Sequence, residues 1–153
     1  MAALTFYEAY RTHEFFVEIE GIPSPRITKV SGLSEGSVDP IDQPDGGANI
    51  VHKISSGIIK YEDLTLERNI DGQDGDKDFK KWFQDMFSMD GAGAGSQLRR
   101  NGSVVVKLNT VEVMRFAFIG AWIKSSKFSE LDASQSGLMK QTIVLAVEQM
   151  YRV

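Results

Sequence analysis

Residues 45–70 constrain the fold more than any other part of the sequence. Apolar and polar side chains alternate along two runs within it, 50–54 and 64–70, which is typical of β-strands. The Ser55-Ser-Gly57 segment between the runs predicts the turn of a hairpin. Because unpaired strand edges attract other chains, a long hairpin with a polar face predicts that copies of this chain assemble.

The same alternation predicts strands in the rest of the chain. They cover residues 15–19, about 26–33, 103–108, 111 to about 124, and 139–150. The strand at 111–124 is apolar on both faces, with Ala117 and Ile123 on one side and Phe118 and Trp122 on the other. This pattern is expected of a central strand that is covered on both sides. Residues 109–110 predict a tight turn before it.

One helix is predicted at 76–89. Phe79, Trp82 and Phe83 begin an apolar stripe at helical spacing, which Met86 and Phe87 continue. The stripe predicts packing on a sheet, and acidic residues at its start suit the positive end of the helix dipole. Glycines at 91–95 end the helix.

The resulting fold class is mainly β (α+β), a small two-sheet β-sandwich or barrel with one packed amphipathic helix. The chain of 153 residues is predicted to be a single domain, residues 1–153. Its first 13 residues form an arm that docks on a partner or folds back on the domain. Residues 34–49, with four carboxylates and two prolines, are predicted as a long acidic loop with a function.

Composition excludes several classes of protein. The formal net charge of −4 argues against a protein that coats nucleic acid. The lack of cysteine excludes disulfides and thiolate metal sites. No apolar run is long enough to span a bilayer, and the first ten residues do not resemble a signal peptide.

Chemistry-bearing motifs are weak. His13 and His52 lack metal-binding spacing, and Ser55 and Ser56 near His52 are better explained by turn formation than by hydrolysis. The aspartates at 74, 76, 78 and 85 resemble a calcium loop, but the sixth position is Phe79 instead of glycine. We therefore expect no catalytic residues, no metal and no cofactor.

A series of motifs in fixed order resembles the tail tube proteins of contractile phages and phage-tail-like contractile injection systems. The motifs are Phe15-Phe-Val-Glu-Ile-Glu-Gly-Ile22, Lys29-Val-Ser-Gly-Leu33, Asp45-Gly-Gly47, the run from Ile54 to Arg68, Arg99-Arg-Asn101, Ala121-Trp122 and Val147-Glu148. Single motifs are weak, but their order over most of the chain is specific. The chain departs from the family at Asn69, Ile123 and residues 140–141, where the family usually has glycine, proline and an early glutamate.

The resemblance implies a hexameric ring whose subunits contribute strands to one barrel around a channel, with rings stacked inside a sheath. It implies sheath, baseplate or hub and tape-measure proteins as partners, and assembly in the bacterial cytoplasm into a virion or an injection particle. The cargo in the channel is DNA or protein without stable binding. A mildly acidic wall would let DNA slide, whereas a neutral or mixed wall suits protein.

Site residues follow from the same resemblance. The candidates for contacts between subunits or rings are Glu35, Asp39, Asp42, Asp45, Gly46, Gly47, Arg68, Arg99 and Arg100. We expect the three arginines to pair with the carboxylates, and we expect Thr65, Glu67 and Asn69 to face the channel. Alternatives are an adaptor ring between tube and baseplate, a terminator ring, the tube of a type VI secretion system, or a monomeric β-sandwich binding module.

Overall fold

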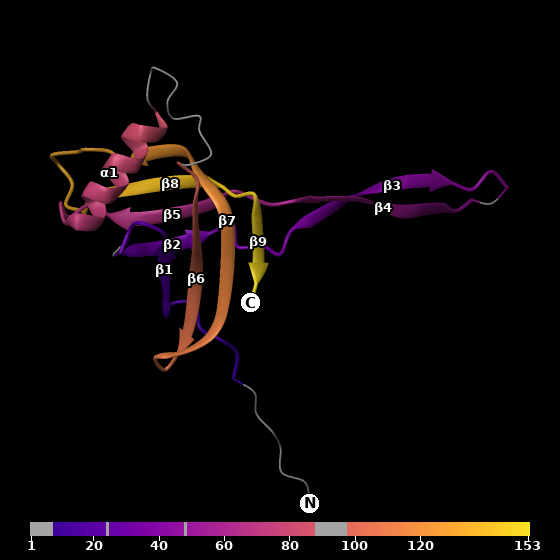
Figure 1. The fold of residues 1–153 in the computed structure, drawn as a ribbon, viewed down its shortest axis with the longest axis horizontal. Coiled ribbons are helices and arrows are strands. Elements are labelled where there is room, and N and C mark those ends of the chain that lie inside the picture. Colours follow the sequence, from indigo (N-terminus) through magenta and orange to yellow (C-terminus); the bar gives the residue numbers. More distant parts are fainter. Residues whose placement is uncertain (1–7, 24, 48, 88–97) are drawn as a thin grey trace, which may run out of the picture.

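The computed structural model describes residues 8–23, 25–47, 49–87 and 98–153. Within them the chain forms nine strands and one helix (Figure 1). In chain order the elements are β1 (Phe15–Ile19), β2 (Ile27–Ser31), β3 (Ser37–Pro44), β4 (Val51–Lys60), β5 (Leu64–Asn69), α1 (Asp74–Met86), β6 (Arg100–Leu108), β7 (Val111–Phe128), β8 (Lys140–Ala146) and β9 (Gln149–Arg152). The prediction of a mainly β fold with one helix is confirmed. No described helix is long and apolar enough to cross a membrane.

The long strand β7 joins two parts of the main sheet. Its first half pairs with β6 and β9, and β1 extends this part beyond β6. Its second half pairs with β8, and β5 and β2 follow in antiparallel order. Figure 1 shows β7 curving from one part into the other, so that the two parts enclose a core.

The bend of β7 lies at Gly120, whose φ of 67° favours glycine. This residue shifts the side-chain alternation: Phe118 is buried before the bend, and Ala121 and Ile123 are buried after it. The predicted shared face of Phe118 and Trp122 is therefore wrong, and Trp122 is exposed. The predicted strand at 139–150 is two strands for the same reason, because β8 follows one half of β7 and β9 the other.

Helix α1 packs on the core side of both parts. Phe79 and Trp82 are fully buried with Leu64, Leu66 and Leu145 of the sheet. The indole nitrogen of Trp82 donates a hydrogen bond to the carbonyl of Leu98 at 2.8 Å, so its polar atom is satisfied inside the core. The predicted helix thus exists, but it begins at Asp74 and ends at Met86. The predicted glycine loop at 91–95 lies outside the described residues.

The structure corrects the predicted hairpin. The turn does not form at 55–57, because these residues lie inside β4, whose pairing with β3 continues on both sides of them. The register changes between Val38 and Pro40, and the Ser55 and Ser56 hydroxyls accept hydrogen bonds from backbone N–H groups two residues later. The Ser-Ser-Gly segment is therefore a β-bulge. The true hairpin is β3–β4, and β5 belongs to the main sheet.

The predicted loop at 34–49 is also wrong, because residues 37–44 form β3. Pro40 and Pro44 made this segment look irregular. Proline is nevertheless tolerated in strands with a neighbour on one side only, and β3 pairs with β4 alone among the described strands. Residues 8–13, the described part of the predicted arm, form neither helix nor strand.

Candidate functional site

The hairpin β3–β4 projects away from the body as an arm (Figure 1). Every residue of β3 and all but Ser56 of β4 are exposed. The arm forms its own two-stranded sheet and has no strand pairing with the main sheet among the described residues. An isolated hairpin of two strands is marginally stable in water, so this arm requires a surface to pack on.

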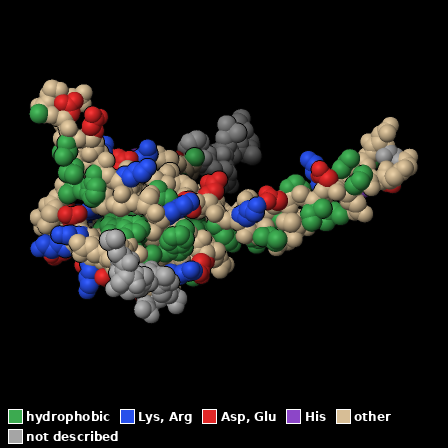
Figure 2. Space-filling view, turned by 90° about the horizontal axis from the view of Figure 1, so that it is seen from above, with side chains coloured by type: hydrophobic (Ala, Val, Ile, Leu, Met, Phe, Trp, Pro, Cys, Tyr) green, Lys and Arg blue, Asp and Glu red, His purple; other side chains and the backbone are tan. Residues whose placement is uncertain are grey.

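Apolar side chains lie along this arm (Figure 2). Ile41 and Ile54 are cross-strand neighbours with 54% and 46% of their surface exposed. Near the body, Ile58 and Ile59 are 66% and 55% exposed. Exposed apolar surface concentrated on one element marks an interaction site. The hairpin is therefore the strongest candidate for an assembly surface.

The main sheet ends in strands with a neighbour on one side only. Strand β1 pairs with β6, β2 pairs with β5, and β9 pairs with β7, and the structure describes no strand at their other edges. Free N–H and C=O groups along such an edge can pair with a strand of another chain. Edge strands thus give the body a second means of association.

Thr65, Glu67 and Asn69 lie on the face of β5 opposite the core, where they are half-buried. Cross-strand pairing places Lys29 of β2, Glu67 of β5, Thr142 of β8 and Lys127 of β7 in one row across this face. The three residues expected to face the channel therefore share one face of the sheet. We call this surface, formed by β2, β5, β8 and the second half of β7, the outer face.

The predicted acidic contact residues occupy exposed positions. Asp39 forms an ion pair with Lys60 across the hairpin, and Glu35 lies 3.6 Å from Arg152. Asp42 is exposed in β3, and Asp45 closes the tip of the hairpin with a backbone hydrogen bond of 3.2 Å to Ile50. The neighbouring glycines 46 and 47 lie in the tip turn, where an added Cβ would meet no other atom within 4 Å.

Arg68 does not fit the predicted contact between subunits. Its side chain is 1% exposed, and its guanidinium donates hydrogen bonds to Asp76 at 2.8 Å and to Gln141 at 2.9 Å. The same group lies over the ring of Phe79, 5.2 Å from the centroid. Arg68 therefore joins helix α1 to β5 and β8 inside the subunit.

Residues 99–101, one of the motifs singled out in the sequence, lie at the bend of β7. Arg99 forms an ion pair with Glu148, and the side chain of Asn101 accepts a hydrogen bond from the N–H of Gly120 at 2.9 Å. Arg100 lies over the ring of Trp82, 4.8 Å from its centroid, and donates to a backbone carbonyl. Arg99 and Asn101 therefore hold the bend, and Arg100 joins the same segment to the helix.

A polar cluster lies on the part of the sheet that β1, β6 and the first half of β7 form. The Arg115 guanidinium donates to Glu18 at 2.9 Å, to the hydroxyl of Ser103 at 2.8 Å and to Glu112 at 2.7 Å. The hydrogen bonds that Arg115 donates to Glu112 lower the pKa of that carboxyl below its ordinary value. The hydrogen bonds to Glu112 and Glu18 raise the pKa of Arg115, so Glu112 and Arg115 are both charged at neutral pH.

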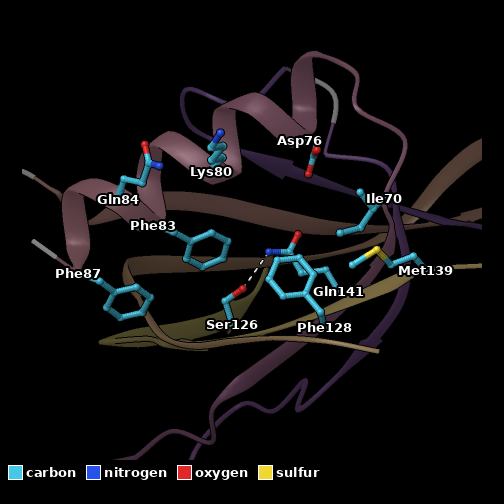
Figure 3. Close-up of a pocket in the computed structure, with 10 residues that line it drawn as sticks. All are labelled: Ile70, Asp76, Lys80, Phe83, Gln84, Phe87, Ser126, Phe128, Met139 and Gln141. Carbon is cyan, nitrogen blue, oxygen red and sulfur yellow. Dashed lines mark hydrogen bonds between the residues drawn. The ribbon is translucent and has the colours of Figure 1, made fainter. Parts of the chain in front are cut away.

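An open groove runs along α1 from Asp76 to Phe87 (Figure 3). Phe83, Phe87 and Phe128 line it, and Phe87 and Phe128 are more than half exposed. A hydrogen bond of 2.8 Å from Gln141 to Ser126 lies at its floor. The groove therefore adds exposed apolar surface on the body.

Within the described part of the chain, no three histidine, cysteine or acidic side chains lie close enough together to hold a metal ion. His52 lies on the exposed hairpin opposite Gln43. Sequence reasoning missed the apolar residues of β3 and the lysines of the outer face. Cross-strand register decides which of these residues share a surface, and the sequence could not provide that register once the hairpin was assigned to the wrong pair of strands.

Comparison with known proteins gives a family and a fold. The family model described as "T4-like virus tail tube protein gp19" matches residues 11–151. No curated protein matches the sequence.

Several solved structures have a similar fold. A chain in the PVC sheath–tube complex of an extracellular contractile injection system, in its extended state, aligns with a TM-score of 0.75 at 20% identity, covering 95% of this chain and 91% of that one. A chain of the anti-feeding prophage baseplate gives a TM-score of 0.75 at 16% identity, covering 97% of each chain. The tube terminating cap of the anti-feeding prophage gives 0.79 at 16% identity, covering 99% and 95%.

Proposed function

Because the chain belongs to the T4-like virus tail tube protein family, we propose that its copies assemble into hexameric rings that stack into the inner tube of a contractile tail or injection system. The family is one of structural tube proteins, and the chain is a structural tube subunit. The observation that carries the assembly proposal is the projecting hairpin β3–β4, whose apolar side chains have no cover within the described chain.

The hairpin docks on a neighbouring copy. Burying one large aliphatic side chain contributes about 1.5–3 kcal/mol, and the hairpin offers several, among them Ile41, Ile54, Ile58 and Ile59. Closing a ring multiplies each contact by the number of copies. Exposed ion pairs are worth only about 0–1 kcal/mol each. Charged residues therefore orient the copies more than they stabilise the contact; these residues are Glu35, Asp39, Asp42, Asp45 and the exposed Arg99.

The edges of the main sheet join copies within a ring. Strand β2 presents a free edge, and pairing it with a strand of the next copy would continue the sheet around the ring. The core and α1 lie on one side of this sheet, so its outer face, with Thr65, Glu67 and Asn69, lines the channel. The sheath surrounds the tube, and baseplate or hub and tape-measure proteins contact its ends or its channel. Assembly occurs in the bacterial cytoplasm.

A cap or terminator ring is the second candidate. It is favoured by the likeness to the tube terminating cap of the anti-feeding prophage, whose TM-score exceeds that of the sheath–tube chain. A cap forms single rings, whereas a tube subunit forms stacks.

Electron microscopy of the purified full chain tests the proposal. We expect rings that stack into tubes as the concentration increases. Single rings that never stack would favour the cap, and a monomer of 17.0 kDa at high concentration would contradict both candidates.

The channel face has its own test. The chain has no cysteine, so Thr65→Cys gives a unique label on the outer face and Lys81→Cys gives one on helix α1. We expect assembly to slow the reaction of Cys at 65 with a bulky maleimide and to leave that at 81 unchanged. If Thr65→Cys reacts equally fast before and after assembly, the outer face does not line the channel.

A further inference from the structure

We infer that the outer face is basic and that it carries an acidic, mixed-charge polypeptide through the channel. The inference rests on the proposed function, because it takes the outer face as the channel wall. The inference rests on how charge is distributed over the molecule. The whole chain has a net charge of −4, but on the outer face lysines outnumber carboxylates.

Four lysines belong to the outer face. Lys29 and Lys127 lie in the row that crosses all four strands, in register with Glu67 and Thr142 respectively. Lys140 pairs opposite Asn69, and Lys124 reaches the same face from a bulge of β7. Each of the four is exposed. The wall therefore presents ammonium groups from three different strands.

Two carboxylates partly offset them. Glu67 lies 3.5 Å from the ammonium of Lys140, and Asp63 lies 2.8 Å from that of Lys124. Lys29 and Lys127 form no ion pair with any described residue. With four positive and two negative groups, the outer face of each copy has a net positive charge. A ring repeats this balance around a narrow channel, where low-dielectric walls strengthen the field.

The arrangement favours a polypeptide over DNA. A nucleic acid presents only negative charge along its backbone, so it can contact the lysines of the wall but not Glu67 or Asp63. A polypeptide with mostly acidic and some basic side chains can match both signs on the wall. The hydroxyl and small apolar side chains between the charges, such as Ser125, Thr142 and Ala146, suit a loosely held chain.

Energy transfer inside assembled tubes tests this inference. A donor dye is attached to Thr65→Cys, and the acceptor is carried by a disordered peptide of repeating Glu-Glu-Lys. A Lys-Lys-Glu peptide of equal length and an oligothymidylate of equal net charge serve as comparison probes. We expect transfer with Glu-Glu-Lys that weakens as salt is added, less transfer with oligothymidylate, and none with Lys-Lys-Glu.

Charge variants identify the residues responsible. Lys29→Glu with Lys127→Glu should reduce retention of the Glu-Glu-Lys peptide about tenfold or more, since a charged wall concentrates counter-ions by at least that factor. Lys77→Glu with Lys81→Glu makes the same change of net charge on exposed positions of α1 and should leave retention unchanged. If the reversed charges prevent assembly, Lys29→Gln with Lys127→Gln takes their place in this test, because it removes the two charges without reversing them.

Micrographs of each sample separate the two proposals. Wild-type tubes that retain no peptide, retain Lys-Lys-Glu equally well or prefer oligothymidylate would overturn the acidic-polypeptide inference and leave the tube proposal standing. Equal transfer from a donor on Lys81→Cys would place the peptide outside the tube and would also overturn it. Failure of the wild-type chain to form rings would overturn both.

Discussion

At the scale of single residues, the buried arginine decides how the helix is held to the sheet. Arg68 reaches Asp76 of α1 and Gln141 of β8 from β5, and Gln141 in turn donates to Ser126 of β7. A buried charge of this kind is costly unless it is paired, so α1, β5 and β8 depend on one another. From the sequence, Arg68 is expected at a contact between subunits, but the structure places it with Leu64 and Leu66 on the buried face of β5.

Removing this guanidinium should destabilise the subunit. We expect Arg68→Ala to lower the free energy of unfolding by about 3 kcal/mol or more, as when one member of a buried pair is removed. Asp76→Asn retains a hydrogen-bond acceptor near Arg68 and should cost less. Urea unfolding of both variants measures the difference. An Arg68→Ala variant as stable as wild type that fails only in assembly would restore the role between subunits.

The ion pair of Glu112 predicts a pH dependence. Its pKa is lower in the folded state because Arg115 donates hydrogen bonds to the carboxylate. Its contribution to stability is therefore present above the unfolded pKa and is lost as the pH falls through the folded pKa. The stability difference between wild type and Glu112→Gln should shrink below the ordinary glutamate value of about 4.3. Thermal melts across that range measure it, and a difference that stays constant with pH would contradict the prediction.

At the scale of elements, the hairpin β3–β4 separates assembly from folding. Ile41 and Ile54 face each other on a strand pair that lies outside the core of the body. We expect Ile41→Asp with Ile54→Asp to abolish rings while leaving the subunit folded, because aspartate can stay hydrated only on an arm that is not buried against a neighbour.

A matched pair of substitutions controls for added negative charge. Leu131 and Leu138 lie between β7 and β8 and are 78% and 71% exposed. Changing both to aspartate should leave rings intact in micrographs, while circular dichroism confirms folding of every variant. Rings formed by the hairpin variant would remove the hairpin from the interface.

The same element marks a limit of sequence reasoning. The alternation at 50–54 correctly indicated a strand with exposed apolar residues, but the prediction of a hairpin turn at Ser55-Ser-Gly57 was wrong. A bulge and a turn use the same residues, however, and only the pairing of β4 with β3 distinguishes them. The prolines of β3 concealed that partner.

At the scale of the whole molecule, stability should depend on protein concentration. A subunit that associates only in its folded state is stabilised by mass action. We expect the melting temperature of wild type to increase with concentration, and that of the Ile41→Asp, Ile54→Asp variant to stay constant. Differential scanning fluorimetry across a dilution series measures both, and a wild-type value that does not change would argue for a solitary subunit.

The sequence by itself determined the strand-rich class, the amphipathic helix and the family, because side-chain periodicity and motif order are local properties of the chain. Tertiary structure alone decided that Arg68 is internal, that β7 bends at Gly120, and that Lys29 and Lys127 share a row. These three facts depend on which strands pair and in what register. Register is set by contacts between residues far apart in the chain, such as Glu67 with Thr142, which no local pattern specifies.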